Sequence, residues 1–431
     1  PGQGGIPGHN LPLYVAQTHQ SPDAEPRPTT MRAPITPVLM ATYAGSSHVM
    51  SKRTPLHDSQ VTAGGCMERV GVWLRARRFS DDGTARKEIE QVRGNVGMLD
   101  ASTLGKFRLF GPDAQRALQR IYAGDMAAIP EGRVKYAAML NEDGCLIDDG
   151  VVVKQSENDY YFTTSSGRAG DTVGWFRYHT RFDGWVYHLV NLTDAMGVIN
   201  LAGPNARKVL EQVTDYDVSN EAFGFGAYCE FTIAGKIPVR AMRLGFVGEL
   251  SYEFHAPASA MQSLWDVLME AGRAFGITNF GLEAQSTLRL EKGHLIIGSE
   301  SEQRTNLRDL DLGFLWYRHK PEAQTVGSVA LAQTEHQKGR LKLVGITTVD
   351  DQAPPPKDGS PIVDDRIRGW LCTARHSTAL GKPVGMALVD DELAAEGTEL
   401  GIYEPGCKGA LIKVRVAKMP FYDPQGERMR M

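Results

Sequence analysis

The sequence predicts an α+β protein built from two related α+β units and a small all-β domain at the C-terminal end. Strands and helices alternate from about residue 54 onward. A strand, a Gly-Pro pair and a helix follow one another twice, at residues 105–121 and 196–213, which indicates an internal duplication. Beyond residue 340 short strands alternate with turn residues, and three prolines at 354–356 exclude a helix there.

These patterns divide the chain into three parts. Residues 1–52 are rich in Pro, Gly, Ser and Thr and predict an extended arm. Residues 53–330 form the duplicated α+β region, and residues 331–431 form the β domain. We expect helices at 88–96, 112–121, 167–180, 205–213 and 281–293, and strands at 105–110, 151–154, 160–164, 196–202, 228–232, 238–244, 343–347, 384–389 and 411–416.

Composition narrows the class of protein. The 431 residues are 42% hydrophobic and 23% charged, with a net charge of −4. No basic block predicts a nucleic-acid partner, and no apolar run reaches the length of a membrane span. The five cysteines are scattered without a CxxC pair, so we expect free, buried thiols, no metal site and a cytoplasmic protein.

Two acidic segments carry the predicted chemistry. Asp148 and Asp149 are separated from the apolar run 151–153 by Gly150 alone, and a strand there would send the two carboxylates to opposite faces. An Asp-rich turn that caps backbone amides is the alternative. In residues 249–255 polar and apolar side chains alternate, which places Glu253 on a polar face. This face is either solvated or holds a carboxylate that can bind a guanidine-like ligand edge, such as that of a pterin.

The predicted helix 281–293 places Gln285, Arg289 and Lys292 on one face, because they are spaced four and three residues apart. This face is either a solvated charged surface or a basic patch for an acidic ligand tail. The sequence by itself leaves both interpretations open.

Taken in order, several segments resemble the aminomethyltransferase (glycine-cleavage T-protein) family. They are residues 54–56, 97–102, 141–149, 245–253 and 288–293, and the resemblance spans about residues 53–425. Within this family the chain is most similar to the C-terminal half of the alpha subunit of heterotetrameric sarcosine oxidase, through residues 99–106, 219–223 and 276–278. The resemblance implies a cloverleaf of two duplicated α+β units around a hole that binds tetrahydrofolate, followed by a β-barrel or Greek-key domain.

The resemblance also implies roles for individual residues. Asp149 is the expected catalytic carboxylate beside the reactive folate nitrogens, and Glu253 is the expected partner of the pterin edge. Tyr136 and Trp316 are expected to line the pocket, and Arg289 to structure the site or meet an acidic group. Family members carry Asn at the position of Ser165, a Tyr-Thr pair at Phe246-Val247 and Ala-Arg-Asp at 284–286. These departures disfavour glycine cleavage itself and a lipoyl-protein partner.

Three functions follow from the resemblance. The first is transfer of the carbon of an oxidised, sarcosine-like N-methyl amine to tetrahydrofolate, which yields 5,10-methylenetetrahydrofolate, next to a flavoprotein oxidase subunit. The second is a tetrahydrofolate-dependent demethylase that acts alone on a methylated small molecule with an O-, S- or N-methyl group. The third is a folate-binding subunit without catalysis.

Overall fold

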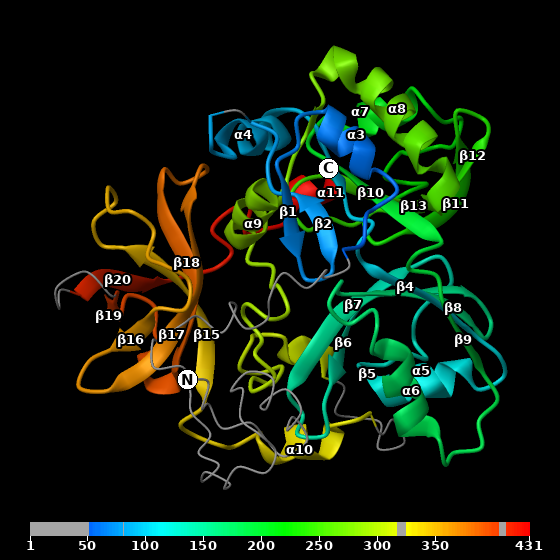
Figure 1. Cartoon of the computed structure of the whole chain (residues 1–431). Helices are drawn as coiled ribbons and strands as arrows, with labels where there is room; N and C mark the ends of the chain where they lie inside the picture. The colour runs from blue at the N-terminus through cyan, green and yellow to red at the C-terminus, as the bar shows by residue number, and fades with distance from the viewer. Residues whose placement is uncertain (1–50, 81, 317–324, 405–410) are drawn as a thin grey trace, which may run out of the picture. The chain divides into compact units, whose positions relative to one another are not determined.

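The structure, a computed structural model, describes residues 51–80, 82–316, 325–404 and 411–431. Two six-stranded sheets, a closed six-stranded barrel and the two-stranded hairpin of β1 (Met67–Val70) and β2 (Trp73–Ala76) make up this part of the chain (Figure 1). The α+β class with a C-terminal β-barrel is therefore confirmed. Apart from Ser51 and Lys52, the predicted arm lies outside the described residues.

One six-stranded sheet has the strand order β5-β6-β7-β8-β4-β9. Two helices, α5 (Ala114–Ile121) and α6 (Thr172–Thr180), cover one face of it, where Phe107, Val152 and Phe162 form a buried core with Leu118 and Phe176. The strands are β4 (Gly105–Phe110), β5 (Tyr122–Ala123), β6 (Val134–Leu140), β7 (Leu146–Ser156), β8 (Asp159–Thr164) and β9 (His188–Asn191).

The other six-stranded sheet has the order β11-β12-β13-β10-β3-β14. One face packs on α7 (Ala206–Glu211) and α8 (Met261–Gly272), and the other face on α4 (Arg86–Gly94) and α9 (Leu282–Glu291). The strands are β3 (Gly97–Asp100), β10 (Met196–Ala202), β11 (Tyr228–Ile233), β12 (Ile237–Met242), β13 (Ser251–Pro257) and β14 (Thr278–Asn279), and the short helix α3 (His57–Thr62) precedes the hairpin.

The two sheets repeat one unit. The order β6-β7-β8-β4 in the first matches β11-β12-β13-β10 in the second. Both β4 and β10 are followed directly by a glycine with positive φ, Gly111 (125°) and Gly203 (130°). A Cβ on Gly111 would come within 2.9 Å of the Tyr187 Cα, and one on Gly203 within 2.5 Å of the Asn95 carbonyl oxygen. Each turn therefore needs glycine for the same reason, close approach of a neighbouring backbone.

The C-terminal barrel closes in the order β15-β18-β17-β16-β19-β20. Gly345 in β15 pairs with both Met386 and Ala417, which joins the first and last strands. The helix α10 (Ser328–Gln333) spans the predicted boundary at 330/331. The barrel strands are β15 (Leu341–Thr348), β16 (Pro361–Val363), β17 (Ile367–Ser377), β18 (Lys382–Asp390), β19 (Glu399–Tyr403) and β20 (Leu411–Ala417), and the chain ends in α11 (Glu427–Arg430).

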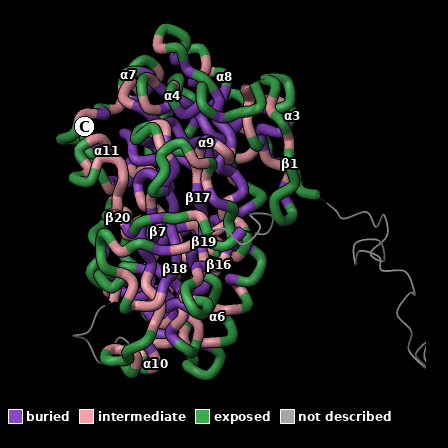
Figure 2. The backbone as a smooth tube through the Cα atoms, turned by 90° about the vertical axis from the view of Figure 1, so that its left-hand side faces the viewer, coloured by how far each residue is buried: buried purple, intermediate pink, exposed green. Residues whose placement is uncertain are grey.

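Most buried segments belong to the strands inside the sheets and the barrel, whereas exposed segments lie at the loops and in edge strands such as β1 and β9 (Figure 2). Among the described helices, none combines the length and the apolar character that crossing a bilayer requires. Of the cysteines in the described residues, all are free and only Cys372 is buried, while Cys66 is exposed. The expectation of uniformly buried thiols was therefore wrong, and Cys407 lies outside the described residues.

Candidate functional site

The two adjacent aspartates lie inside a strand and face opposite ways. β7 begins at Leu146, five residues earlier than the sequence predicted, because it pairs with β6 along this whole stretch. Asp148 lies opposite Met139, and Asp149 lies opposite Ala138. Successive side chains of a strand point to opposite faces, so Asp148 faces the helix-covered core and Asp149 faces away from it. The alternative of an Asp-rich turn was wrong.

Asp149 is held by Tyr136. The Tyr136 hydroxyl donates a hydrogen bond of 2.6 Å to the Asp149 Oδ2. Burial raises the pKa of Asp149 to about 6, although the hydrogen bond from Tyr136 lowers it. Asp148 is fully buried, and burial together with the charge of Asp149 raises its pKa to about 7. Of the two, Asp149 is therefore the carboxylate that is ionised at neutral pH and keeps partial exposure.

Glu253 lies on a polar face that is buried. Asn200 and Glu253 are cross-strand partners, and Asn200 donates a hydrogen bond of 2.8 Å to the hydroxyl of Ser251. Glu253 is 8% exposed and His255 is fully buried. The predicted alternation is confirmed, but the interpretation as a solvated face was wrong, because the opposite sheet and α9 cover this surface. A buried polar row of this kind is costly unless its groups are bonded, which points to a ligand site.

The two acids face one buried contact between the sheets. Val153, Tyr161 and Met242 form an apolar cluster against which Val151 also packs. Val151 and Val153 share the face of Asp149 on β7. Met242 is the cross-strand partner of Glu253, and such partners lie on the same face. Asp149 and Glu253 thus lie on the two sheet faces that this cluster joins, on strands about a hundred positions apart in the sequence.

Trp316 belongs to the same region. It follows a short 3₁₀ turn at Gly313–Leu315 and packs, with Tyr136, against a buried cluster that includes Ala138. Ala138 is the cross-strand partner of Asp149. The predicted aromatic wall of Tyr136 and Trp316 therefore lies on the Asp149 face of the sheet.

Two of the positions that depart from the family pattern lie in different places. The Ser165 backbone N–H lies 3.3 Å from the Asp148 Oδ1, so Ser165 supports the buried acid rather than Asp149. Phe246 stacks on the His294 ring at 5.7 Å, and the Phe246 carbonyl lies 2.8 Å from the His294 Nδ1. Among the described residues, the hydrogen bond and the ring contact of Phe246 both go to His294 and not to either site acid.

The predicted basic face of α9 does not exist as a free surface. Arg289 is buried, donates to the Glu300 Oε2 at 2.8 Å and bonds the His294 carbonyl at 3.0 Å. Lys292 is buried against Asp423 at 3.0 Å. The interpretation as a solvated surface was wrong, because both cations are buried and pair with carboxylates 11 and 131 positions away, on Glu300 and Asp423. Arg289 meets an acidic group of the protein itself.

Sequence reasoning missed three buried groups at the contact between the sheets. Tyr161 and His255 bond each other across it, with 2.9 Å between the Tyr161 oxygen and the His255 Nδ1. Lys106 is fully buried, and burial lowers its pKa to about 8. His255 lay on the predicted polar face, and that alternation was the available clue.

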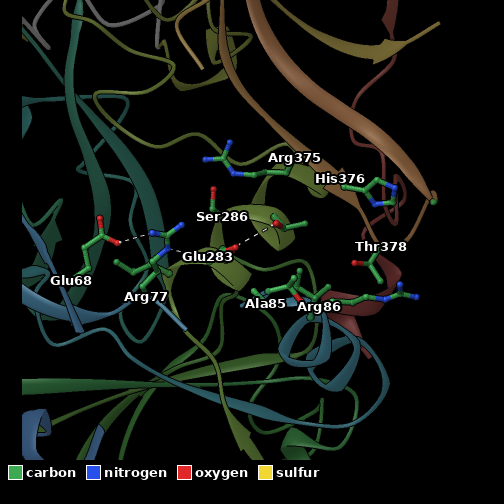
Figure 3. Close-up of a pocket in the computed structure, with 14 residues that line it drawn as sticks. Glu68, Arg77, Ala85, Arg86, Glu283, Ser286, Arg375, His376 and Thr378 are labelled. Atoms are coloured by element: carbon green, nitrogen blue, oxygen red, sulfur yellow. Dashed lines mark hydrogen bonds and ion pairs between the residues drawn. The ribbon is translucent and has the colours of Figure 1, made fainter. Parts of the chain in front are cut away.

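A different cavity, of about 650 Å³, lies between α4, α9 and the barrel strand β17 (Figure 3). It contains Arg77, Arg86 and Arg375, but each of these already pairs with a carboxylate: Glu283, Glu90 and Asp358 respectively. The cavity also lacks buried groups with shifted pKa values. We therefore place the candidate site at the Asp149 face rather than in this cavity.

The described residues contain no group of three or more His, Cys, Asp or Glu side chains that could hold a metal ion. The donor set at the Asp149 face consists instead of two carboxylates, a phenol and an indole. Carboxylates accept N–H bonds, and aromatic walls stack on flat rings. The arrangement suits a planar, nitrogen-rich ligand that presents N–H donors.

Comparison with known proteins identifies the family of the chain. Residues 56–320 match the GCVT N-terminal domain, and residues 342–423 match the glycine cleavage T-protein C-terminal barrel domain. The chain therefore belongs to the aminomethyltransferase (glycine-cleavage T-protein) family of transferases.

The similar proteins are of two kinds, aminomethyltransferases and alpha subunits of sarcosine oxidase. An aminomethyltransferase of Bacillus subtilis is 30% identical over 86% of this chain and 99% of its own length. A sarcosine oxidase subunit alpha of Corynebacterium is 31% identical over 94% of this chain but only 43% of its own length, so the chain spans less than half of that relative. The glycine cleavage system aminomethyltransferase T of Bartonella henselae has the same fold, with a TM-score of 0.77, 23% identity, and coverage of 86% of this chain and 98% of that one.

Proposed function

We propose that this chain binds tetrahydrofolate at the contact between the two sheets and catalyses transfer of a one-carbon unit to it. Glu253 would accept N–H bonds from the pterin edge, while Tyr136 and Trp316 would flank the ligand. Asp149 would lie beside the reactive nitrogens. The observation that carries the proposal is the pair of acids, Asp149 and Glu253, facing one buried cluster from two different sheets.

Tetrahydrofolate would supply the amine nitrogens that take up the carbon. The protein's part is to position the ligand and to stabilise charge. An ionised Asp149 stabilises positive charge that develops on a neighbouring nitrogen. A pKa raised to about 6 also makes Asp149 a better proton acceptor near neutral pH than an ordinary aspartate. The Tyr136 hydrogen bond fixes the orientation of that carboxylate.

We further propose that the carbon comes from an oxidised, sarcosine-like N-methyl amine, with 5,10-methylenetetrahydrofolate as the product. A flavoprotein oxidase chain would carry out the oxidation. This proposal draws on the three relatives named sarcosine oxidase subunit alpha, which match between 93% and 100% of this chain.

The test separates binding from turnover in an Asp149→Asn variant. Calorimetry with folinic acid, a stable folate, should show that the wild type binds and that the variant binds within about threefold. Formation of 5,10-methylenetetrahydrofolate from sarcosine, in a mixture with a flavoprotein sarcosine oxidase, should fall about 10²–10⁴-fold. The matched control is Asp143→Asn, an exposed position on the turn before β7, which should change neither.

Two outcomes would contradict the proposal. If the wild type fails to bind folinic acid, the folate site is wrong. If Asp149→Asn binds folinic acid and turns over like the wild type, the site stands but Asp149 has no part in the reaction.

One observation favours a second function, demethylation by the chain alone. The aminomethyltransferase relatives match over 97% to 100% of their own lengths, so the chain spans the whole of enzymes of that name. Incubating the purified chain with tetrahydrofolate and O-, S- and N-methyl donors, without flavoprotein, discriminates the two. Consumption of a donor would favour the stand-alone demethylase. Binding without either reaction would leave a folate-binding subunit.

A further inference from the structure

His255 lies between two groups that come from different sheets. Its Nδ1 is 2.9 Å from the hydroxyl oxygen of Tyr161 on β8, and its Nε2 is 3.5 Å from the Oε2 of Glu253 on its own strand. His255 and Tyr161 are both fully buried. The His255 Nε2 has no hydrogen-bond partner within the part of the chain that the structure describes. A buried imidazole nitrogen without a hydrogen-bond partner destabilises the fold, unless a small movement completes the hydrogen bond from Nε2 to Glu253.

The surrounding charges decide which nitrogen of the ring carries the proton. Burial has the largest effect on the pKa of His255 and lowers it; Glu253 raises the pKa, but burial together with Lys106 and Arg240 outweighs Glu253, so the ring is neutral at pH 7. A neutral imidazole has one N–H and one lone pair. A lone pair on Nε2 would face the Glu253 carboxylate and repel it. The stable arrangement is therefore Tyr161 O–H donating to Nδ1, with Nε2–H directed at Glu253.

We propose that Tyr161 and His255 form a relay that positions the Glu253 carboxylate for the pterin edge. This inference rests on the proposed function. By fixing the tautomer of His255, Tyr161 directs an N–H at one carboxylate oxygen, and the other oxygen stays free for the ligand. Closing the gap of 3.5 Å to a normal hydrogen bond needs only a shift of a few tenths of an ångström, a change that ligand binding commonly produces.

The relay makes Tyr161 and His255 positioning residues, because neither would touch the ligand. Within the described residues, no lysine or arginine forms an ion pair with Glu253. The neutral N–H of His255 thus orients the carboxylate without neutralising it, whereas a cation in its place would compete with the ligand's own N–H donors. Recognition of the 2-amino group of the pterin should therefore depend on the relay.

The test compares two ligands by calorimetry on the full chain: folinic acid, and its analogue with a methyl group in place of the 2-amino group. The wild type should bind folinic acid at least about tenfold more tightly than the analogue. His255→Leu should weaken folinic acid by about tenfold and bind the analogue as the wild type does, so that discrimination is lost. His255→Gln, whose side-chain amide can donate in place of Nε2–H, should restore part of it.

Tyr161→Phe should reduce discrimination by a few-fold, since His255 then loses the donor that fixes its tautomer. The matched control is Tyr160→Phe, because Tyr160 is 2% exposed on the opposite, helix-covered face of the same strand. It should leave both affinities unchanged. Glu253→Gln should abolish discrimination altogether.

The outcomes separate the relay from the proposed function. If the wild type binds folinic acid and His255→Leu weakens both ligands equally, the relay is wrong while the folate site stands. If the wild type and His255→Leu discriminate equally between folinic acid and the analogue, the relay is likewise wrong and the folate site stands. If the wild type binds neither ligand, the folate site and the relay fall together.

Discussion

The two six-stranded sheets of this protein share one strand arrangement, but they carry different functional side chains at corresponding positions. Gly111 and Gly203 are 92 positions apart, and the carbonyls that accept their N–H bonds, on Asn158 and Leu250, are separated by the same number. With that spacing Tyr161 in one unit corresponds to Glu253 in the other. One unit thus supplies a phenol where the other supplies a carboxylate, and the two positions meet through His255 at the contact between the sheets.

The hairpins differ more than the strands. β7 and β8 are joined by a tight turn, whereas residues 243–250 form a longer loop between β12 and β13. Val153 pairs with Tyr161, and Met242 pairs with Glu253, so Asp148 corresponds to Ile237 and Asp149 to Pro238. Ile237 is a core residue and Pro238 is exposed. The acid pair therefore occurs in only one of the two units and is not required by the shared scaffold.

The largest expected effect is on the free energy of unfolding, and it tests whether the turns after β4 and β10 both require glycine. Gly203→Ala should lower the free energy of unfolding by about 4 kcal/mol and Gly111→Ala by about 3 kcal/mol, from backbone strain plus steric overlap. Gly203 should be the more sensitive, because a Cβ there would approach backbone at 2.5 Å rather than 2.9 Å. Urea unfolding measures both. Gly167→Ala, where a Cβ meets nothing within 4 Å, is the control.

An intermediate effect on stability should come from Asp148, which corresponds to Ile237 in the other unit. The pKa of Asp148 is raised to about 7 in the fold, against about 4 unfolded, so the folded state binds this proton more tightly. Wild-type stability should therefore fall as pH rises from about 4 to about 7. Asp148→Asn removes that loss and should be more stable than the wild type by about 1–3 kcal/mol at pH 8.

Thermal unfolding of wild type and Asp148→Asn at pH 5 and pH 8 checks this prediction. The stability difference should widen with pH. A constant difference would mean that Asp148 already carries its charge in the fold at pH 5.

The smallest expected effect concerns the hydrogen bond from Tyr136, which Asp149 accepts and Asp148 does not. Tyr136→Phe removes the donor that favours the ionised form of Asp149, so the pKa of Asp149 should rise further above about 6. If turnover needs the ionised carboxylate, its acid limb should move to higher pH by up to about one unit. The pH profile of kcat measures the shift. An unmoved profile would show that Asp149 does not set this limb.

Local patterns were sufficient for much of the fold. β4 and β10 begin and end where alternation and the Gly-Pro pairs predict, and α9 is followed by Gly293, which adopts a φ of 77°. The face that carries Glu253 and His255 was also correct, because a period of two is a property of the strand alone. The sequence did not establish that the strand includes Asp149, since the apolar run that predicts the strand starts only at Val151.

What the sequence determined by itself was part of the set of elements, the duplicated turn and the two acids, because these depend on neighbours within a few residues; it did not predict α8 or the barrel strand β17. Only the tertiary structure decided which charged groups are already neutralised and which remain available. Arg289 and Lys292 are neutralised by Glu300 and Asp423, and the latter lies 131 positions from its partner. Burial and ion pairing depend on segments brought together by folding, so local periodicity carries no information about them.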